Sequence, residues 1–417
     1  MPSVGIESMN VFGGTAFVDV EELARHRGMD TARFHNLLMK QKAVALPNED
    51  PITFAANAAK PLVDALSPAE RDRIEMLITC SESGIDFGKS MSTYVHQVLG
   101  LNRNCRLFEL KQACYAGTAG FQMACNFVLA QTSPGAKALV VSTDISRFIV
   151  GDGVDPRSQE WSYSELSAGA GAVAMLVGES PSVFEIDPGA NGYYGYEVMD
   201  TCRPLPDSDA GDADLSLLSY LDCCEQAFLE YQRRVDGADF RETFHHLVFH
   251  TPFGGMVKGA HRNMMRKLAG ASAAVIEDDF QRRVLPGLAY CQRVGNIMGG
   301  TIFLALAGLL DAVDLPVARR VGCFSYGSGC CSEFYSGVIA PAGQRRQRAL
   351  GIAAALDARH RLSIDEYEEV LRTSGVVRFG TRTATLDARP TDAAPVAAQR
   401  LLLRKIRDFH RQYEWVA

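Results

Sequence analysis

The chain has 417 residues, of which 47% are hydrophobic and 22% charged, and this composition predicts a globular protein of two domains or one duplicated fold. Its formal net charge of −7 argues against bulk nucleic-acid binding, and the lack of a long apolar run argues against a membrane span. The N-terminus shows no secretory pattern, so we expect a cytoplasmic protein whose 11 cysteines are free thiols. Cys223-Cys224 and Cys330-Cys331 are adjacent pairs rather than C-x-x-C spacings, so no metal site is expected.

Short apolar runs alternate with longer segments of helical spacing. Such runs, bounded by Gly, Ser and Pro, are typical of buried strands. Strands are predicted at 4–12, 73–80, 137–143, 170–178, 245–250 and 319–327, and helices at 52–67 and 115–131. This alternation predicts an α/β fold whose central strands are mostly parallel.

Two segments carry a faint internal repeat. Residues 167–178 and 325–338 both contain G-x-G and continue as a strand, which suggests a duplicated architecture with a boundary near 180–200. Neither segment runs from a strand into a helix in the dinucleotide-binding pattern, so a nicotinamide cofactor is not expected.

The end of the chain differs in character from the rest. Residues 341–351 are predicted to be a linker-like or amphipathic surface stretch, and 363–374 begin with a serine and an acidic turn that indicate a helix start. Residues 397–415 are predicted to form a basic amphipathic helix. That helix either packs on the body with its charges in water or docks a partner.

The stretch ELKQACYAGTAG (109–120) places Cys114 before a run of small residues. Such a run predicts a closely packed, buried helix with Cys114 at its N-terminal end. The helix dipole and the unpaired N–H groups there are expected to lower the thiol pKa and to hold an oxyanion. The alternative interpretation is an inert structural cysteine.

Two polar residues could work with such a nucleophile. His250 ends the apolar strand in HLVFHTPFGG, where α/β folds display chemistry, whereas His245, His246 and His261 are less favourable. Asn296 stands at a tight turn before a small-residue helix, where it either caps the helix or contacts substrate.

A carboxylate follows another predicted strand in ITCSESGIDFGKS (78–90). Glu82 stands just past the strand, where burial raises a carboxyl pKa toward the range useful for acid–base catalysis. Asp86 is the alternative, but it lies further along the loop.

The motifs around these residues resemble a known family. The matching stretches are ITCSESGIDFGKS, FELKQACYAGTAG, STDISRF, NGYYGYEVMDTCRP, GDADLSLLSYL, FHTPFGGMVKGAHRNMMRK, VGNIMGG and FSYGSGCCSEFYSG. With them the chain resembles the 3-hydroxy-3-methylglutaryl (HMG) synthases of the thiolase superfamily. More narrowly, it resembles the branch-forming synthases of polyketide pathways, which act on acyl carrier proteins (ACPs). The resemblance covers residues 4 to about 340.

The resemblance implies an α/β thiolase-like fold of two related βαβαβ halves in a layered α-β-α-β-α arrangement. Residues 1–180 would form the half with Glu82 and Cys114. Residues 181–417 would form the half with His250 and Asn296 and would include a helical tail over 341–417. A homodimer is implied as well.

The resemblance also implies catalytic roles. Cys114 would take acetyl from a donor ACP, and Glu82 would deprotonate the acetyl methyl group and protonate the new alkoxide. His250 would orient the β-ketoacyl group of an acceptor ACP and polarise its carbonyl. The product would be a β-hydroxy-β-carboxymethyl chain, released from Cys114 by water.

Substrate-binding groups are implied around these three residues. Asn296 would assist His250, and a backbone N–H near Tyr326 and Ser328, most directly that of Ser328, would complete the oxyanion hole with that of Cys114.

One departure from the mevalonate-pathway relatives concerns the substrate carrier. Those enzymes typically have a lysine after the histidine that contacts the coenzyme A phosphates, whereas this chain reads HTPFGGMVKG with its first lysine at Lys258. This favours a phosphopantetheine arm on an ACP, with no tightly bound cofactor. Candidate docking residues are Arg33, Lys40, Lys258, Arg262 and Arg266.

Three other functions compete with this interpretation. A ketosynthase of the same superfamily would need no carboxylate at position 82. A coenzyme A-dependent HMG synthase of the mevalonate pathway would share all three catalytic groups. A non-catalytic scaffold would be expected to have lost the nucleophile.

Overall fold

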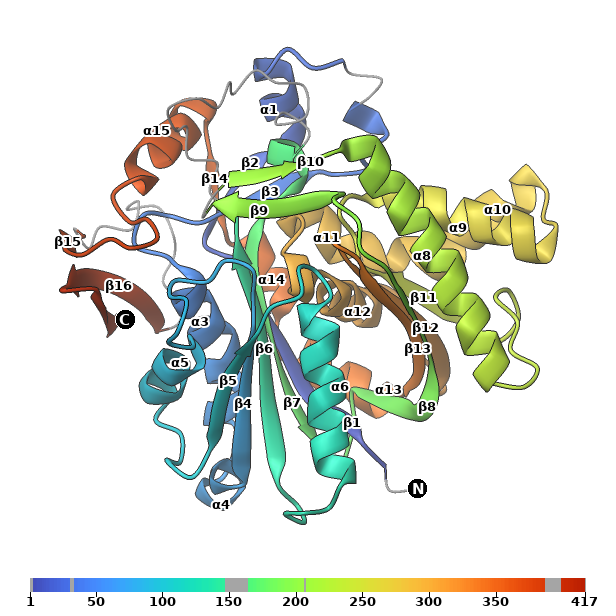
Figure 1. Ribbon diagram of the computed structural model, residues 1–417, viewed down its shortest axis with the longest axis horizontal. Helices are drawn as coiled ribbons and strands as arrows, with labels where there is room; N and C mark the ends of the chain where they lie inside the picture. Colours follow the sequence, from blue (N-terminus) through green and yellow to red (C-terminus); the bar gives the residue numbers. More distant parts are fainter. Residues whose placement is uncertain (1–2, 31–33, 147–163, 206–207, 387–398, 417) are drawn as a thin grey trace.

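A nine-stranded mixed sheet crosses the molecule in the order β11-β12-β13-β8-β1-β7-β6-β4-β5 (Figure 1). The computed structural model describes residues 3–30, 34–146, 164–205, 208–386 and 399–416. The strands of the sheet are β1 (Gly5–Phe12), β4 (Ile74–Cys80), β5 (Arg106–Leu110), β6 (Lys137–Ile145), β7 (Ala170–Gly178), β8 (Phe184–Gly195), β11 (His246–Phe249), β12 (Arg319–Gly327) and β13 (Cys331–Ile339). Every strand predicted from the sequence is present.

The direction of the strands differs from the prediction. Among the described strands of this sheet, neighbours are parallel only between β11 and β12, between β4 and β6, and between β4 and β5. The other neighbours are antiparallel. The prediction of mostly parallel central strands is therefore wrong. An apolar run indicates burial on both faces, but it does not reveal the direction of the adjacent strand.

The sheet consists of two halves with a matching strand order. The first half runs β5-β4-β6-β7-β1 and the second runs β11-β12-β13-β8, and β1 pairs with β8 where the halves join. The two G-x-G segments lead into β7 and β13, which hold equivalent places, so the predicted internal repeat is confirmed. The predicted boundary at 180 falls between β7 and β8.

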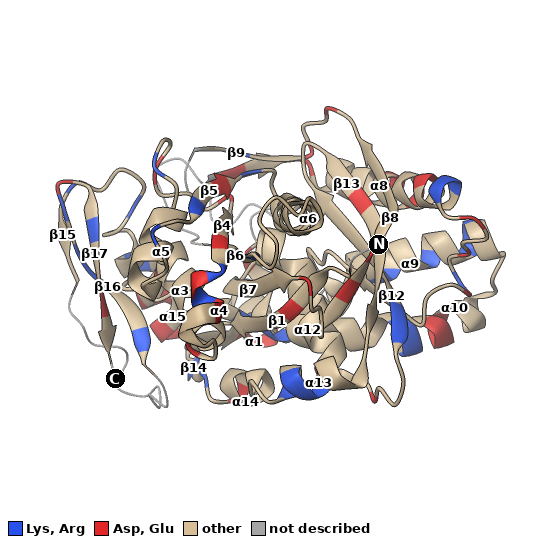
Figure 2. Cartoon of the chain, turned by 90° about the horizontal axis from the view of Figure 1, so that it is seen from below, with Lys and Arg blue, Asp and Glu red and all other residues tan. Residues whose placement is uncertain are grey.

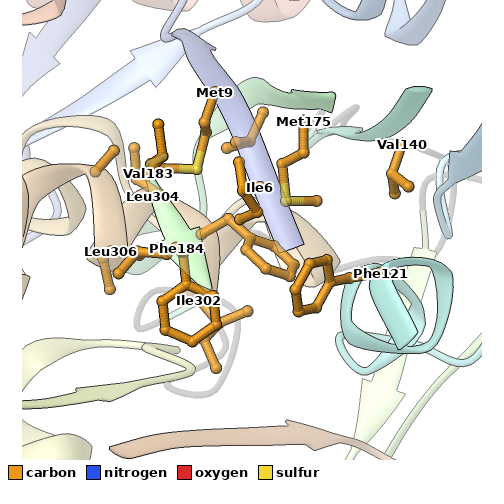
Figure 3. Close-up of a cluster of buried hydrophobic side chains, with 14 of the residues drawn as sticks. Ile6, Met9, Phe121, Val140, Met175, Val183, Phe184, Ile302, Leu304 and Leu306 are labelled. Atoms are coloured by element: carbon orange, nitrogen blue, oxygen red, sulfur yellow. The ribbon is translucent and has the colours of Figure 1, made fainter. Parts of the chain in front are cut away.

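Helices form three layers around these halves (Figure 1). Helix α3 (Pro51–Asp64) covers β1, β6 and β7, and α8 (Ala213–Arg234) covers β8 and β13. Helices α6 (Ala116–Leu129) and α12 (Thr301–Ala312) lie between the two halves. The ring of Phe121 on α6 packs against that of Phe184 of β8 (Figure 3), and it also contacts the rings of Phe303 of α12 and Tyr335 of β13. This is the layered arrangement that the resemblance implied.

Smaller elements surround these layers. The remaining helices are α1 (Val20–His26), α4 (Pro68–Asp72), α5 (Ser92–Leu99), α9 (Gly254–Ala269), α10 (Ala273–Asp279), α11 (Leu288–Val294), α13 (Pro341–Arg348), α14 (Ile352–Asp357) and α15 (Ile364–Ser374), with single turns at Phe280–Val284, Leu285–Gly287 and Met298–Gly300. The smaller sheets contain β2 (Ala16–Asp19), β3 (Gln41–Val44) and β14 (His360–Leu362); β9 (Thr201–Leu205) and β10 (Ser208–Gly211); and β15 (Ala384–Thr385), β16 (Arg400–Arg407) and β17 (His410–Val416). The predicted helix start at Ser363 is confirmed, because Ser363 and Glu366 form a capping box at α15. No helix of the described ranges is both long and apolar enough to cross a membrane.

The described end of the chain is a β-hairpin, so the amphipathic helix predicted for residues 397–415 is wrong. The turn residues Asp408 and Phe409 have φ of 47° and 67°, the conformation of two-residue turns that suit twisted antiparallel strands. Tyr413 and Trp415, two residues apart, pack against the body at strand period. The predicted helical tail is thus helical in α13, α14 and α15 and a hairpin after them (Figure 1).

The hairpin is fixed to the first half through the N-cap of α3. Asp50 accepts from the amide of Thr53 and, through its other oxygen, from Arg411 Nη1 at 2.8 Å and Tyr413 Oη at 2.7 Å. The Asp50 and Arg411 side chains are both buried. One carboxylate therefore caps a helix and neutralises a buried cation.

Asp50→Ala is expected to destabilise the protein by about 3–5 kcal/mol, because it leaves the Arg411 charge buried without its partner. Asp64→Ala is the matched control, since Asp64 forms an exposed pair with Lys60 at 2.7 Å that is worth about 1 kcal/mol or less. Urea unfolding followed by tryptophan fluorescence compares the two variants. Equal unfolding midpoints would show that the hairpin contact adds nothing to stability.

Candidate active site

Cys114 lies on a sharp turn between β5 and α6. The preceding residue, Ala113, has φ of 43°, a strained value for a residue with a side chain, so the surroundings must hold this turn. The amides of Tyr115 and Ala116 donate to the carbonyls of Gln112 and Ala113 as the helix begins. The predicted position of Cys114, just before a buried helix, is confirmed.

The charge state of the Cys114 thiol differs from the expectation. Its pKa is raised well above the usual value, chiefly by loss of hydration and further by the negative charges of Glu82 and Asp144. The expectation of a lowered pKa is therefore wrong, because burial and the nearby carboxylates raise the pKa of this thiol. The resting nucleophile is a neutral thiol.

Two glycines let loops of the second half reach the turn at Cys114. A Cβ atom on Gly327 would lie 2.6 Å from the amide nitrogen of Tyr115, so the end of β12 touches the backbone beside Cys114. A Cβ atom on Gly117 would lie 2.1 Å from the carbonyl oxygen of Gly299, so the turn before α12 packs on the start of α6. Only glycine permits such close approach.

His250 directly follows β11, the strand that corresponds to β4 of the first half. Its backbone N–H donates to the carbonyl of Phe324 on β12 at 2.7 Å. The side chain is 1% exposed, and burial lowers its pKa to about 3. Its Nδ1 atom has no hydrogen-bond partner among the described residues. His250 is therefore a neutral imidazole able to bind a ligand without adding charge.

The other candidate histidines are placed differently. His245 and His246 lie at the opposite end of β11, and the buried His261 forms a hydrogen bond through Nε2 with Asp279 at 2.7 Å. These positions agree with the prediction that the three histidines are less favourable partners of the nucleophile than His250.

Glu82 follows β4 and meets a cation from β9. Arg203 Nη2 lies 3.3 Å from Glu82 Oε1, and Arg203 Nη1 donates to the Glu82 carbonyl at 3.2 Å. Arg203 also pairs with Asp209 at 2.7 Å. Burial raises the pKa of Glu82 to about 7, against the lowering effect of Arg203. This carboxyl can therefore both accept and donate a proton near neutral pH.

Asp86, the alternative carboxylate, has a local structural function. Its exposed side chain accepts from the amides of Gly88 and Lys89, each at 2.7 Å, and these bonds lower its pKa. It shapes the loop and lacks the burial expected of a general base.

Asp144, at the end of β6, was missed in the sequence. Its Oδ1 atom accepts from Ser81 Oγ and from the amides of Glu82 and Ser83, each at 3.0 Å. Its Oδ2 atom is buried with no hydrogen-bond partner among the described residues, and burial raises the pKa of this carboxyl. A lone carboxylate at the end of an apolar strand was the available signal. Asp144 holds the backbone that carries Glu82.

Asn296 caps the turn before α12. Its Oδ1 atom accepts from the amide of Met298 at 3.0 Å and from Thr301 Oγ1 at 2.9 Å, so the capping interpretation is confirmed. Its own amide donates to the carbonyl of Ser167 at 2.8 Å. The side-chain Nδ2 donates to no described residue, so capping leaves this donor available to a ligand.

The turn with Ser328 is held by Asp200, a second carboxylate that sequence reasoning missed. The hydroxyl of Tyr326 donates to Asp200 Oδ2 at 2.5 Å, and the amide of Gly329 donates to Oδ1 at 2.9 Å. Tyr326 is 3% exposed and uses its hydroxyl in this contact, which makes it a positioning group. Ser328 is half-buried beside it.

Three of the basic residues predicted to dock a carrier protein lie on α9, a helix with blue Lys and Arg positions in Figure 2. Four-residue spacing places these three on one side of this helix: Lys258, Arg262 and Arg266. Lys258 pairs with Glu277 of α10 at 2.9 Å, whereas Arg262 and Arg266 are exposed. Lys40 is exposed in the segment whose Leu37 carbonyl accepts from the start of α9. Arg33 lies outside the described residues.

Two family models match the chain, hydroxymethylglutaryl-coenzyme A synthase N terminal over residues 1–182 and C terminal over residues 262–379. The chain belongs to the hydroxymethylglutaryl-CoA synthase family. His250 and Arg203 lie between the two matched regions, and the hairpin of β16 and β17 follows the second of these regions. Within the described ranges, no three His, Cys, Asp or Glu side chains gather as metal ligands do.

Similar proteins include enzymes with two kinds of substrate carrier in their names. A polyketide biosynthesis 3-hydroxy-3-methylglutaryl-ACP synthase of Bacillus subtilis (strain 168) is 67% identical over 420 residues, 100% of both chains. A hydroxymethylglutaryl-CoA synthase of Enterococcus faecalis is 33% identical over 369 residues, 88% of this chain and 91% of the relative. The solved curacin biosynthetic pathway HMG synthase in complex with holo donor-ACP has 62% identity and a TM-score of 0.96, over 99% of this chain and 100% of that one. The predicted thiolase-like α/β fold is confirmed.

Proposed function

We propose that this protein is an HMG-ACP synthase of polyketide β-branching. One observation carries the proposal. The strand and helix ends hold a thiol, a carboxyl with a pKa of about 7 and a neutral imidazole, and they do so in a chain closely related to such a synthase. The identity to that relative is 67% over the full length of both chains. The enzyme transfers acetyl from a donor ACP to the β-ketone of a chain on an acceptor ACP. It forms no tightly bound complex with a cofactor, because the phosphopantetheine arm carries each substrate.

The first step is acetyl transfer to Cys114. The thiol sulfur attacks the donor thioester, a new thioester forms on Cys114, and the phosphopantetheine thiol leaves with the proton lost by Cys114. The amides of Tyr115 and Ala116 are engaged by backbone carbonyls, so the amide of Cys114 itself and that of Ser328 are assigned to the oxyanion.

The second step forms the carbon–carbon bond. The Glu82 carboxylate removes a proton from the acetyl methyl group, and the resulting enolate attacks the β-carbonyl carbon of the acceptor. Glu82 then returns the proton to the alkoxide. Neutral His250 and the Nδ2 group of Asn296 orient the acceptor. Water finally hydrolyses the thioester on Cys114 and leaves a carboxymethyl branch.

Carrier-protein docking is assigned to the exposed basic face at α9. Arg262, Arg266 and Lys40 can meet the phosphate of the arm and the acidic surface typical of its carrier. A homodimer is proposed from the family resemblance.

Intact-protein mass spectrometry tests the function. Acetyl-ACP and acetyl-coenzyme A are offered separately, and the gain of one acetyl group is followed over time. Faster loading from acetyl-ACP supports the proposal. Equal or faster loading from coenzyme A would indicate a primary-metabolic synthase, and no loading from either would indicate a scaffold.

Arg203→Met is expected to move the pH profile of condensation upward by about one unit or more. Arg203 lowers the pKa of Glu82, so without it the carboxylate forms only at higher pH. Condensation is measured from pH 5.5 to 9 on enzyme already acetylated. Asp209→Asn removes a negative charge that raises this pKa, so its profile is expected to move downward. If the pH profiles of both variants moved in the same direction, the charges of Arg203 and Asp209 would not set the pKa of Glu82 as described.

A further inference from the structure

Glu333 of β13 is a buried carboxyl that the proposed reaction does not use. Its side chain is completely buried, and burial raises its pKa to about 7. Both of its oxygens accept hydrogen bonds from uncharged groups. Oε2 accepts from Tyr115 Oη at 2.6 Å, while Oε1 accepts from Gln122 Nε2 at 2.8 Å and from Asn191 Nδ2 at 3.2 Å. Because a carboxyl is costly to bury, a group held in this way indicates a specific function.

These contacts join the two halves of the fold. Asn191 lies on β8, the strand next to β13, so it holds the carboxyl within the second half. Tyr115 at the N-cap of α6 and Gln122 further along this helix belong to the first half. The two amides share Oε1, whereas Oε2 accepts only from Tyr115 among the described residues. The carboxyl is therefore held by amides at one oxygen and holds the residue after Cys114 with the other.

The turn that carries Cys114 needs such support. Ala113 has φ of 43°, a strained conformation that persists only where the surroundings impose it. At the backbone, Gly327 at the end of β12 lies against the amide of Tyr115. At the hydroxyl, Tyr115 is held by Glu333 of β13, and β12 and β13 are paired neighbours. One rigid side chain next to the nucleophile is thus fixed at both ends by the second half.

We propose that Glu333 is a positioning residue for acetyl transfer, which acts through the hydroxyl of Tyr115 to keep the Cys114 thiol in line with the donor thioester. The effect is one of geometry, because a displacement of about 1 Å at a reacting group can slow a reaction by about 10²-fold. This inference rests on the proposed function and adds a residue that neither the general base nor the oxyanion hole includes.

Tyr115→Phe removes the single hydroxyl that reaches Glu333 Oε2. Acetyl loading is followed by rapid mixing and intact-protein mass spectrometry over a range of acetyl-ACP concentrations. The rate constant at saturating donor is expected to fall roughly tenfold or more, while the half-saturating donor concentration and the final acetylated fraction stay at wild-type values. A variant that merely folded poorly would lower the final fraction instead, so the two quantities separate positioning from stability.

Glu333→Leu and Glu333→Gln test the acceptor of this hydrogen bond. Leucine accepts no hydrogen bond, so the rate constant is expected to fall as in Tyr115→Phe. Glutamine keeps one carbonyl oxygen for Tyr115, and the side-chain amides of Gln122 and Asn191 can turn their own oxygens toward its NH2 group. Loading in Glu333→Gln is therefore expected to stay near the wild-type rate. The test does not depend on the folding of Glu333→Leu, because Tyr115→Phe breaks the same contact from the other side.

Tyr231→Phe is the matched control. Tyr231 is buried on α8 and also directs its hydroxyl to β13, where its Oη atom lies 2.9 Å from Ser336 Oγ, but it is not part of the turn at Cys114. Its loading rate constant is expected to equal that of the wild type.

Three results would overturn the positioning role of Glu333. They are an equal loss of rate in Tyr231→Phe, a wild-type rate constant in Tyr115→Phe, and a loss in Glu333→Gln as large as that in Glu333→Leu. Absence of acetyl loading in the wild type would instead overturn the proposed function, and the role of Glu333 with it.

Discussion

Cys114→Ala is expected to abolish acetyl loading and to lower overall turnover by about 10⁴-fold or more. The reason lies in position, because the thiol stands on a strained turn where loops from both halves meet. Seven of the other cysteines are buried, and three are partly exposed: Cys105, Cys202 and Cys331. Intact-protein mass spectrometry after incubation with acetyl-ACP measures the loss.

Cys105→Ala is the matched control for this variant. Cys105 is also a partly exposed thiol, and burial raises its pKa to about 11, but it lies before β5 rather than after it. Its loading is expected to match the wild type. If acetyl loading persisted in Cys114→Ala and vanished in Cys105→Ala, the nucleophile would be Cys105, before β5, and the assignment to Cys114 would be wrong.

Much of the fold could be predicted because buried strands are short apolar runs. The strand at 170–178 is completely buried in the structure, and its sequence shows no polar residue. Strand direction could not be predicted, since an apolar run looks the same beside a parallel or an antiparallel neighbour. The hairpin at 400–416 was mistaken for a helix because its leucine run suits either structure. The decisive feature, an Asp-Phe turn with positive φ, lacks the glycine that usually marks such turns.

The catalytic candidates could be predicted because the duplicated fold places them at equivalent points. Glu82 follows β4 and His250 follows β11, while Cys114 precedes α6 and Asn296 precedes α12. Each stands where an apolar run meets a polar residue, which a sequence shows directly.

The residues that tune these candidates could not be found in the same way. Arg203 reaches Glu82 across 121 positions in the chain, and Asp144 across 62. Such partners are defined only by the folded sheet. The same holds for the pKa of Cys114, which depends on three carboxylates that sequence position alone does not place beside it.

Glu82→Gln is expected to separate the two steps of the reaction, acetyl loading and condensation. Condensation is expected to fall by about 10³-fold, because glutamine can neither take a proton from the acetyl methyl group nor return one to the alkoxide. In the wild type, condensation should rise with pH through about 7, as the Glu82 carboxyl ionises, and this dependence should vanish in the variant. Single-turnover condensation on acetylated enzyme measures both effects.

Acetyl loading in Glu82→Gln is expected to be at least as fast as in the wild type. The negative charge of Glu82 raises the pKa of Cys114, so its removal increases the thiolate fraction at neutral pH. Asp86→Asn is the control, because Asp86 is an exposed carboxylate in the same loop and should leave both steps near wild type. Loss of loading in Glu82→Gln would show that Glu82 deprotonates the thiol, and condensation at the wild-type rate would remove it as the general base. Fast loading without condensation is the one result that places the carboxyl in the second step alone, because the same charge that removes the methyl proton opposes formation of the thiolate.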